Sequence, residues 1–225
     1  MSIRFDRTKA LIGAEAFGKI EKSHVLVVGL GGVGGAAVEV LARSGVGKLT
    51  LVDGDSFEPT NLNRQILATE AELGMNKAAA AKKRVLAVNS KADVTEIGEF
   101  VTPSNIESIL SAGCDYAVDA IDDVKNKVLL ISACKAKGIP VVSALGAGNR
   151  IDCDFAVTDV FKTSGDPFAR VMRRELKKIG VTELDAVCSS TPPLVRSGTP
   201  SSIAAPPLVM GAMLANFVIK GLIGV

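Results

Sequence analysis

A glycine-rich run near the start of the chain has the spacing of a phosphate-binding loop. The run G-L-G-G-V-G supplies Gly29, Gly31, Gly32 and Gly34, after a short apolar stretch and before a segment with helical spacing. Glycine permits a tight turn and a close approach of backbone to phosphate, while the N-terminus of the next helix offers free N–H groups and a positive dipole. The run predicts a nucleotide site, but it does not by itself separate ATP from a dinucleotide.

The residues beyond the next apolar stretch distinguish the two ligands. Asp53 follows Gly34 by 19 residues, and a carboxylate there can accept hydrogen bonds from ribose hydroxyls. A hydride-transfer enzyme has no obvious need for the cations that follow, Arg64 and Lys77. An enzyme that handles a triphosphate can use both to neutralise the charge that develops on phosphate oxygens. These residues therefore favour ATP over NAD.

Two acidic residues could serve a metal ion. Asp122 comes directly after a predicted strand, and so lies at the carboxyl edge of a parallel sheet, where ligands bind. Together with Asp55 it could supply oxygen ligands to Mg²⁺. No zinc is expected, because the chain has one histidine and none of its four cysteines form a C-x-x-C pair.

Alternating elements must position these residues. Short apolar runs alternate with segments of helical spacing through the first two-thirds of the chain, which predicts an α/β fold with a doubly wound, Rossmann-like, mostly parallel sheet. The predicted strands are 24–29, 48–53, 92–97, 115–119 and 140–144, and the predicted helices are 32–44, 76–89, 103–112 and 124–137. The connection 53–74 is long for such a fold, which suggests a functional loop.

The pattern changes after about Gly146. The predicted elements are an extended, antiparallel segment over 151–160, an amphipathic helix over 167–179, a long loop over 189–207 and an apolar helix over 208–223. The last is shorter than the ~20 residues of a membrane span, so we expect it to be buried or to lie at a dimer interface. We expect one domain, 1–225, with a nucleotide-binding part (1–148) and an acceptor and dimer part (149–225).

Composition limits how the chain could bind nucleic acid. Hydrophobic residues make up 48 % and charged residues 22 % of the 225, which excludes wholesale disorder. The net charge is only +2, so binding would need a local basic patch. At ~100° per residue, the cations of 167–179 share one helix face: Arg170, Arg173, Arg174, Lys177 and Lys178. That face is either a nucleic-acid contact or a solvated surface.

The N-terminal residues and the cysteines indicate the compartment. Residues 1–6 carry charge and no apolar run, so no signal peptide is expected. Unpaired, reduced cysteines are typical of a cytoplasmic protein. Cys188 could act as a relay thiol, although an incidental packed thiol is the simpler interpretation.

As a set, the motifs resemble the ThiF/HesA/MoeB adenylyltransferases, which are related to ubiquitin-activating enzymes. The resemblance is carried by R-F-D-R at 4–7, the glycine run, D-G-D at 53–55, N-x-x-R-Q at 61–65, G-x-x-K at 74–77 and D-A-I-D at 119–122. In this family ATP adenylates a carboxylate and releases pyrophosphate. The resemblance thus implies an ATP- and Mg²⁺-dependent enzyme.

The same resemblance implies roles for individual residues. Asp53 would hold the ribose, Asp122 would serve the magnesium ion, and Arg7 would reach into the neighbouring subunit's site, which implies a homodimer. Arg7, Arg64, Lys77 and Asp122 would be the catalytic residues. The implied nucleotide contacts are Gly29, Gly31, Gly32, Gly34, Asp53, Asp55, Asn61, Arg64, Gln65 and Lys77.

Members of the family differ in the molecule whose carboxylate they adenylate. Members that activate ubiquitin-like sulfur carriers usually carry two zinc-binding C-x-x-C pairs, which this chain lacks. The segments 100–103 and 151–167 are instead similar to the tRNA threonylcarbamoyladenosine dehydratases, in which a threonyl carboxylate is adenylated and then cyclised. That similarity implies tRNA as substrate, with the basic helix face as its contact. A sulfur-transfer protein is a possible further partner.

Other functions stay open from the sequence. One is adenylation of the C-terminal glycine of a sulfur-carrier protein. Two alternatives come from other classes of protein. The glycine run alone would also fit an NAD-dependent oxidoreductase. A non-catalytic nucleotide-binding scaffold would be expected to have lost the charged residues Arg64, Lys77 and Asp122, which this chain retains. Segment 189–202 also departs from the dehydratase pattern, because Pro192 stands where an acidic residue is expected.

Overall fold

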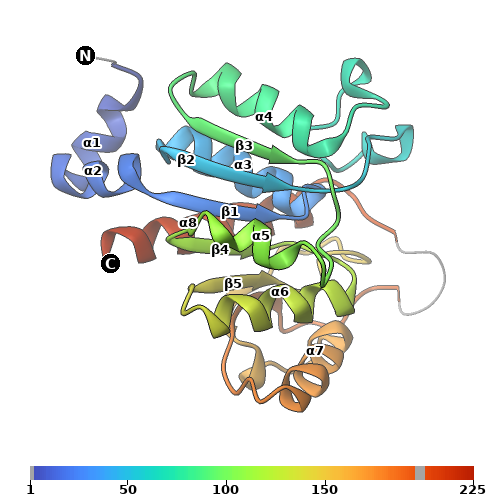
Figure 1. The fold of residues 1–225 in the computed structure, drawn as a ribbon. Helices are drawn as coiled ribbons and strands as arrows, with labels where there is room; N and C mark the ends of the chain where they lie inside the picture. Colours follow the sequence, from blue (N-terminus) through green and yellow to red (C-terminus); the bar gives the residue numbers. More distant parts are fainter. Residues whose placement is uncertain (1–2, 196–200) are drawn as a thin grey trace.

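The computed structural model describes residues 3–195 and 201–225. Within them the chain builds a seven-stranded sheet in the order β3-β2-β1-β4-β5-β7-β6 (Figure 1). The strands are β1 (His24–Val28), β2 (Lys48–Val52), β3 (Asp93–Ile97), β4 (Tyr116–Asp119), β5 (Val141–Ala144), β6 (Phe155–Asp159) and β7 (Asp185–Ser189). All pairs are parallel except β6 with β7. The predicted doubly wound sheet is confirmed, and its order reverses between β1 and β4, where a ligand crevice is expected.

Helices cover both faces of the sheet (Figure 1). One face packs against α3 (Gly32–Ser44), α4 (Lys77–Val88) and α8 (Ala205–Ile223), and the other against α5 (Ile106–Ser111), α6 (Val124–Ala136) and α7 (Pro167–Lys178). Two short helices, α1 (Asp6–Ile12) and α2 (Ala14–Lys22), lie outside these layers at the amino end of the parallel strands. The opposite, carboxyl end of the sheet is left to the connecting loops.

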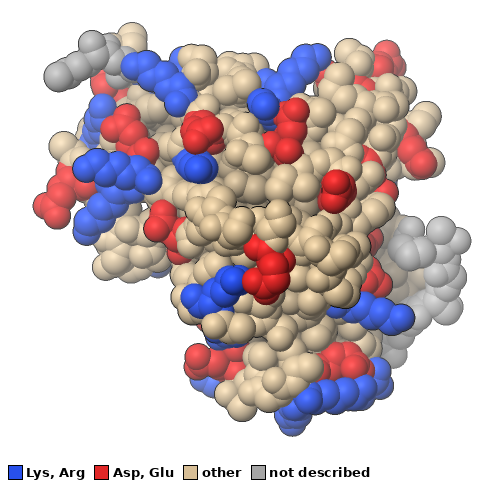
Figure 2. Space-filling view, in the orientation of Figure 1, with Lys and Arg blue, Asp and Glu red and all other residues tan. Residues whose placement is uncertain are grey.

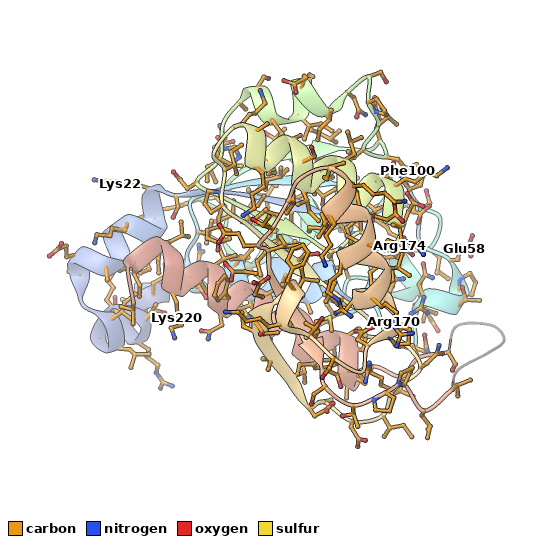
Figure 3. All side chains as sticks on the ribbon, turned by 90° about the horizontal axis from the view of Figure 1, so that it is seen from below. Lys22, Glu58, Phe100, Arg170, Arg174 and Lys220 are labelled. Carbon is orange, nitrogen blue, oxygen red and sulfur yellow. The ribbon has the colours of Figure 1, made fainter. Side chains whose placement is uncertain are left out.

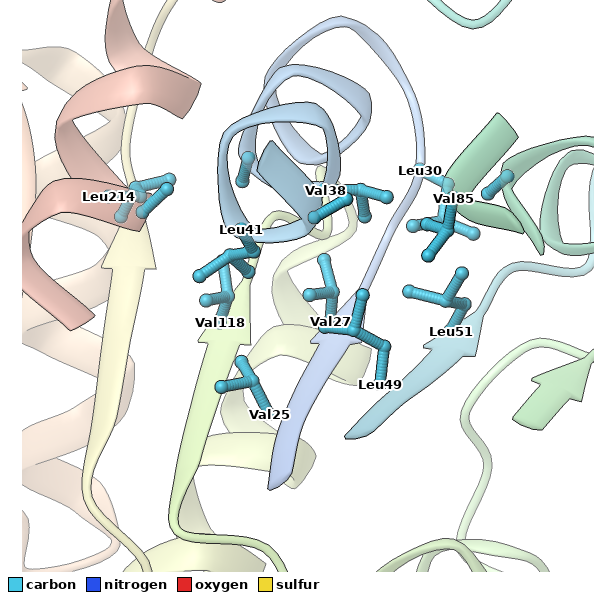
Figure 4. Close-up of a cluster of buried hydrophobic side chains, with 14 of the residues drawn as sticks. Val25, Val27, Leu30, Val38, Leu41, Leu49, Leu51, Val85, Val118 and Leu214 are labelled. Carbon is cyan, nitrogen blue, oxygen red and sulfur yellow. The ribbon is translucent and has the colours of Figure 1, made fainter. Parts of the chain in front are cut away.

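The central strand β1 shows why its sequence is apolar without alternation. Successive side chains point to opposite faces, so Val25 and Val27 enter the core beneath α3 while Leu26 and Val28 enter the other core. A strand buried on both faces reads as a continuous apolar run. Figure 4 shows Val25 and Val27 packed with Leu41 of α3 and Leu214 of α8.

Several boundaries differ from the sequence prediction. Helix α5 begins at Ile106 rather than Pro103, because Asn105 Oδ1 accepts the N–H of Thr102 and folds 103–105 into a turn. The extended segment 151–160 is a strand only from Phe155. The prediction missed α1, α2 and β7, which are short and lack a long apolar period.

Helix α8 begins three residues earlier than predicted, with Pro206 and Pro207 in its first turn. Its 19 residues suffice by length and composition to cross a membrane. It packs closely on α3, however: a Cβ on Gly211 would lie 2.2 Å from the carbonyl oxygen of Val33. Met210 and Leu214 are fully buried. The prediction of a buried helix is thus confirmed for one face of α8, while its other face stays partly exposed.

The single histidine gives the fold a pH dependence. His24 starts β1, and its Nε2 lies 2.8 Å from Thr50 Oγ1. Burial lowers the pKa of His24, and Lys48 adds to the shift while Asp115 opposes it. The unfolded chain therefore binds more protons below pH ~6.5, so the free energy of unfolding falls as the pH drops from there towards the lowered folded pKa.

We expect a His24→Asn variant to lose this component. Denaturant unfolding of both proteins at intervals from pH 8 to 5.5 measures it. As the pH falls below the histidine pKa of the unfolded chain, ~6.5, the free energy of unfolding should decrease more for wild type than for the variant. Equal slopes for the two proteins would show that His24 titrates alike in the folded and unfolded states.

Candidate functional site

A cavity of about 1580 Å³ opens at the carboxyl edge of the sheet. It exceeds the ~300–1,000 Å³ of a typical small-molecule site, so it has room for a nucleotide and part of a second reactant. Its walls come from the glycine loop, the segment after β2, the turn after β4 and the segments 144–150 and 166–168. Of the predicted site residues, the lining includes Gly29, Gly31, Gly32, Asp53, Asp55, Asn61, Arg64, Gln65, Lys77 and Asp122.

The glycine loop lies tightly against the turn that follows β4. Gly29 has φ +85°, in the left-handed region, and a Cβ there would lie 2.6 Å from the carbonyl oxygen of Ala120. Gly34 does not line the cavity. A Cβ on it would lie 1.7 Å from the carbonyl oxygen of Gly29, so the lack of a side chain at Gly34 is what allows the loop to close.

Asp53 links β2 to the glycine loop. Its Oδ2 accepts the N–H of Leu30 at 2.6 Å, and its Oδ1 accepts the N–H of Asp55 at 2.9 Å. Burial raises the pKa of Asp53, and the two backbone donors and Lys77 counteract that shift. A carboxylate oxygen can accept more than one hydrogen bond, so Asp53 can still accept from a ligand hydroxyl while it holds the loop.

Two cations reach the cavity from different elements. Lys77 is the first residue of α4, which Asn76 caps by accepting the N–H groups of Ala78 and Ala79. Its side chain is 8 % exposed, and its Nζ lies 3.0 Å from Asp55 Oδ2. The Arg64 guanidinium donates to the carbonyl oxygen of Thr60 at 2.8 Å. The pair gives the cavity wall two preorganised positive charges suited to phosphate oxygens.

Gln65 shows that the cavity fits a polar ligand. The residue is 6 % exposed, and its Oε1 has no hydrogen-bond partner among the described residues. Its amide lies beside the glycine loop, since a Cβ on Gly31 would be 3.8 Å from Gln65 Nε2. Leaving a buried amide oxygen unpaired costs about 1–3 kcal/mol. Because this oxygen accepts hydrogen bonds, a ligand N–H or O–H group beside it would explain why it has no partner in the protein. Glycine loop, cations and amide together fit a nucleotide.

The donor set also fits a magnesium ion held with a nucleotide. Asp55 and Asp122 are exposed and line the same cavity. Mg²⁺ is usually bound by one or two carboxylates together with substrate phosphates rather than by a full protein cage. The described residues contain no cluster of three or more His, Cys, Asp and Glu side chains that could hold a metal alone, and such a site needs none.

The five cations of α7 do not behave alike. Arg173 turns back to the segment before α7, where it donates to the carbonyl oxygen and hydroxyl of Thr163, so the predicted common face does not include it. Arg174 and Lys178 both pair with Glu175. Arg170 and Lys177 are exposed. Figure 2 shows blue atoms mixed with red at the end of the molecule that carries α7.

None of the α7 cations lines the cavity, although Pro167 and Phe168, at the start of α7, do. Figure 3 places Arg170 and Arg174 at the same end of the molecule as Phe100, which belongs to the cavity wall. Lys22 and Lys220 lie at the opposite end. Phe100 is 54 % exposed and was not predicted as a site residue; its signal in the sequence is an aromatic residue three positions after the end of β3.

Arg7 lies far from the cavity of its own chain. It is exposed on α1, at the amino end of the sheet, whereas the cavity opens at the carboxyl end. Arg7 therefore cannot contact a ligand in its own subunit's cavity.

The thiols are poor candidates for chemistry. Cys188 is buried at the end of β7 and does not line the cavity, and burial raises its pKa. Burial likewise raises the pKa of Cys114 to about 11 and that of Cys134 to about 12. A protonated thiol is a weak nucleophile, so Cys188 is a packed thiol rather than a relay.

Sequence reasoning missed a buried arginine in the second half of the cavity. Arg150 is 7 % exposed and donates from Nε to the carbonyl oxygen of Gly146 at 2.9 Å and from NH1 to Ser189 Oγ at 2.8 Å. NH1 also donates to the carbonyl oxygen of Thr191, and NH2 lies 3.9 Å from Oδ2 of Asp166, the N-cap of α7. Arg150 therefore ties three segments of the cavity wall together. No periodicity marks a residue whose partners are distant in the chain.

Comparison with known proteins agrees with this site. The chain is 43 % identical to the Escherichia coli tRNA threonylcarbamoyladenosine dehydratase over 175 residues, which are 77 % of this chain and 65 % of that enzyme. It is 37 % identical to the Bacillus subtilis tRNA threonylcarbamoyladenosine dehydratase over 194 residues, 85 % of this chain and 76 % of that one.

The structural match is as extensive. The crystal structure of the E. coli enzyme in complex with ATP superimposes with a TM-score of 0.92 at 35 % identity, covering 98 % of this chain and 94 % of that chain. The ThiF family model matches residues 5–225. Because that range includes both halves of the cavity and the helices around them, the chain belongs to the ThiF family.

Proposed function

We propose that this protein uses ATP to adenylate the threonyl carboxylate of threonylcarbamoyladenosine in tRNA, and that the activated side chain then cyclises. The observation that carries the proposal is one cavity in which the glycine loop, Asp53, Arg64 and Lys77 meet, with the unpaired Gln65 amide oxygen beside them. The similarity to E. coli and B. subtilis enzymes of that name supports the choice of acceptor.

The chemistry follows from where the charges lie. An oxygen of the acceptor carboxylate attacks the α-phosphorus of ATP, the bond to the bridging oxygen breaks, and pyrophosphate leaves. Negative charge grows on the phosphate oxygens, and Arg64 and Lys77 are already in place to stabilise it. Asp53 holds the ribose. A nitrogen or oxygen of the acceptor then attacks the acyl carbon, closes the ring and expels AMP.

A magnesium ion would share this charge stabilisation. Asp122 is its proposed ligand, with Asp55 as a second, since both carboxylates face the cavity. Asp55 Oδ2 also pairs with Lys77 Nζ at 3.0 Å. We propose that the nucleotide part, 1–148, holds ATP and that 149–225, which supplies Arg150 and Asp166 to the wall, receives the acceptor and contributes to a cytoplasmic homodimer.

Pyrophosphate release tests the proposal. Purified protein with ATP and Mg²⁺ is incubated with tRNA that carries threonylcarbamoyladenosine, and separately with unmodified tRNA. We expect stoichiometric pyrophosphate and AMP only with the modified tRNA. Release that requires a sulfur-carrier protein instead would favour that acceptor, and tighter binding of NAD than of ATP would remove the adenylation proposal.

The dimer makes a prediction about Arg7. Because Arg7 lies at the far edge from its own cavity and α8 exposes part of an apolar face, we propose that Arg7 completes the partner's site. Mixing inactive Arg7→Ala and Lys77→Ala proteins should give heterodimers in which one of two sites is intact. With random exchange roughly a quarter of wild-type activity should return. No recovery despite demonstrated exchange would contradict a role for Arg7 across the interface.

The exposed cations of α7 make a prediction about tRNA. If Arg170 and Arg174 contact the phosphate backbone, an Arg170→Gln/Arg174→Gln variant should weaken binding and flatten the plot of log affinity against log salt by about 0.7–0.9 for each phosphate that is no longer neutralised. ATP affinity should not change. A Lys22→Gln/Lys220→Gln variant removes the same charge at the opposite end and serves as the control. Identical salt plots for the two variants would exclude α7 as the tRNA-binding element.

A further inference from the structure

A buried charged cluster below the cavity floor has no part in the contacts described so far. It consists of Asp119 at the end of β4, Lys127 in α6 and Ser143 on β5, each 0 % exposed. Lys127 Nζ lies 2.8 Å from Asp119 Oδ2, and Ser143 Oγ donates to the same oxygen at 2.7 Å. Within the described residues, no other ion pair has both partners at 0 % exposure.

Stability alone explains this cluster poorly. Two charges taken out of water lose their hydration, and replacing such a pair with apolar residues of similar volume is often neutral or stabilising. Burial lowers the pKa of Lys127, while Asp119 and, more weakly, Asp122 counteract that shift. The Lys127 ammonium has therefore lost its hydration, and the negative charges of Asp119 and Asp122 offset part of that cost. Of these two residues, Asp122 lines the cavity.

The cluster fixes the turn that carries Asp122. The second oxygen of Asp119, Oδ1, accepts the N–H of Ile121 at 3.2 Å. Ala120 is held from the other side, since its N–H donates to the carbonyl oxygen of Val28 at 2.8 Å. The orientation of the Asp119 carboxylate thus sets the path of the backbone into Asp122.

We propose that Lys127 is a positioning residue for the metal ligand: by holding Asp119, it fixes the turn that presents the Asp122 carboxylate to Mg²⁺ bound with ATP. This inference rests on the proposed function. Lys127 itself is fully buried and does not line the cavity.

Calorimetric titration of ATP with and without Mg²⁺ tests the inference. Wild type should bind ATP more tightly with Mg²⁺, and Asp122→Asn should lose most of that gain. Lys127→Met should weaken Mg²⁺ binding by roughly 10–100-fold, as residues that support a metal ligand do, with little change in Mg²⁺-free ATP affinity. In the absence of nucleotide, the Ile121 amide should exchange hydrogen faster in Lys127→Met than in wild type.

Lys125→Met is the matched control, since it removes an exposed lysine two positions earlier on the same helix. It should keep the wild-type Mg²⁺ effect. A folded Lys127→Met protein that also keeps it overturns the inference. Failure of wild type to bind ATP at all is a different result, because it overturns the proposed function itself.

A double variant covers the case in which Lys127→Met does not fold. Asp119→Asn/Lys127→Met removes both charges and leaves an amide that can still bond to the Ile121 N–H. It should fold and still lack the Mg²⁺ effect. A double variant that regains the effect, or that fails to fold, assigns the cluster to stability alone and overturns the inference.

Discussion

Replacing Lys77 with alanine is expected to reduce turnover by ~10²–10³, the loss found when one preorganised charge is removed from a transition state. Lys77 Nζ is held at the cavity wall by Asp55 and by its place in the first turn of α4. The charge it would stabilise grows during pyrophosphate release, so the loss should appear in kcat. Arg64→Ala should have an effect of the same size.

The fold should tolerate both changes. Asp55 is 56 % exposed, and ion pairs with an exposed partner contribute little to stability. Lys82→Ala is the matched control, because Lys82 lies on the same helix and pairs with Glu96, away from the cavity. Single-turnover pyrophosphate release measures the chemical step. A loss of less than about threefold for Lys77→Ala, beside an unchanged melting temperature, would show that Lys77 is not a phosphate contact.

Gly34→Ala is expected to destabilise the protein by about 1–3 kcal/mol or more, the usual cost of overpacking a core, and to abolish ATP binding. The new Cβ would lie 1.7 Å from the carbonyl oxygen of Gly29. That neighbour is backbone and cannot rotate away, so the glycine loop must move.

Gly18→Ala provides the comparison. Gly18 is also helical, but a Cβ there meets nothing within 4 Å, so this change should stabilise the fold by about 0.5–1 kcal/mol. Denaturant unfolding and ATP titration of the two variants measure both effects. Wild-type ATP affinity in Gly34→Ala would show that the loop can open without loss of the site.

The parallel strands could be predicted because burial on both faces of the sheet determines which residues they contain. A strand such as β1, buried on both faces, must be apolar throughout, and its boundaries agree with the sequence to within one residue. Helices α1 and α2 were missed because they are short: α1 buries no residue, and α2 buries only Phe17 and Ile20, a single helical repeat. Gly34, which was predicted as a nucleotide contact, does not line the cavity, and its lack of a side chain makes space for the loop.

The nucleotide half of the site could also be predicted, since a glycine loop, a carboxylate and two cations follow one another in sequence. Arg150, Arg173 and Lys127 could not be. Each is a cation whose role depends on partners that lie elsewhere in the chain or on a burial that the sequence does not record. Arg173 shows the difference best, because helical spacing places it with solvent-facing cations while Thr163 draws it inward.

The packing of α8 on α3 has a consequence for the timing of activity during synthesis. Helix α3 begins in the glycine loop, and α8 supports it: Pro207 lies 3.0 Å from where a Cβ on Gly32 would be, and Gly211 approaches the backbone of Val33. Until α8 has been synthesised and has packed on α3, a growing chain has only part of the support for its glycine loop. We therefore expect ATP to be retained only by chains that already contain a folded α8, so that shorter chains do not consume ATP.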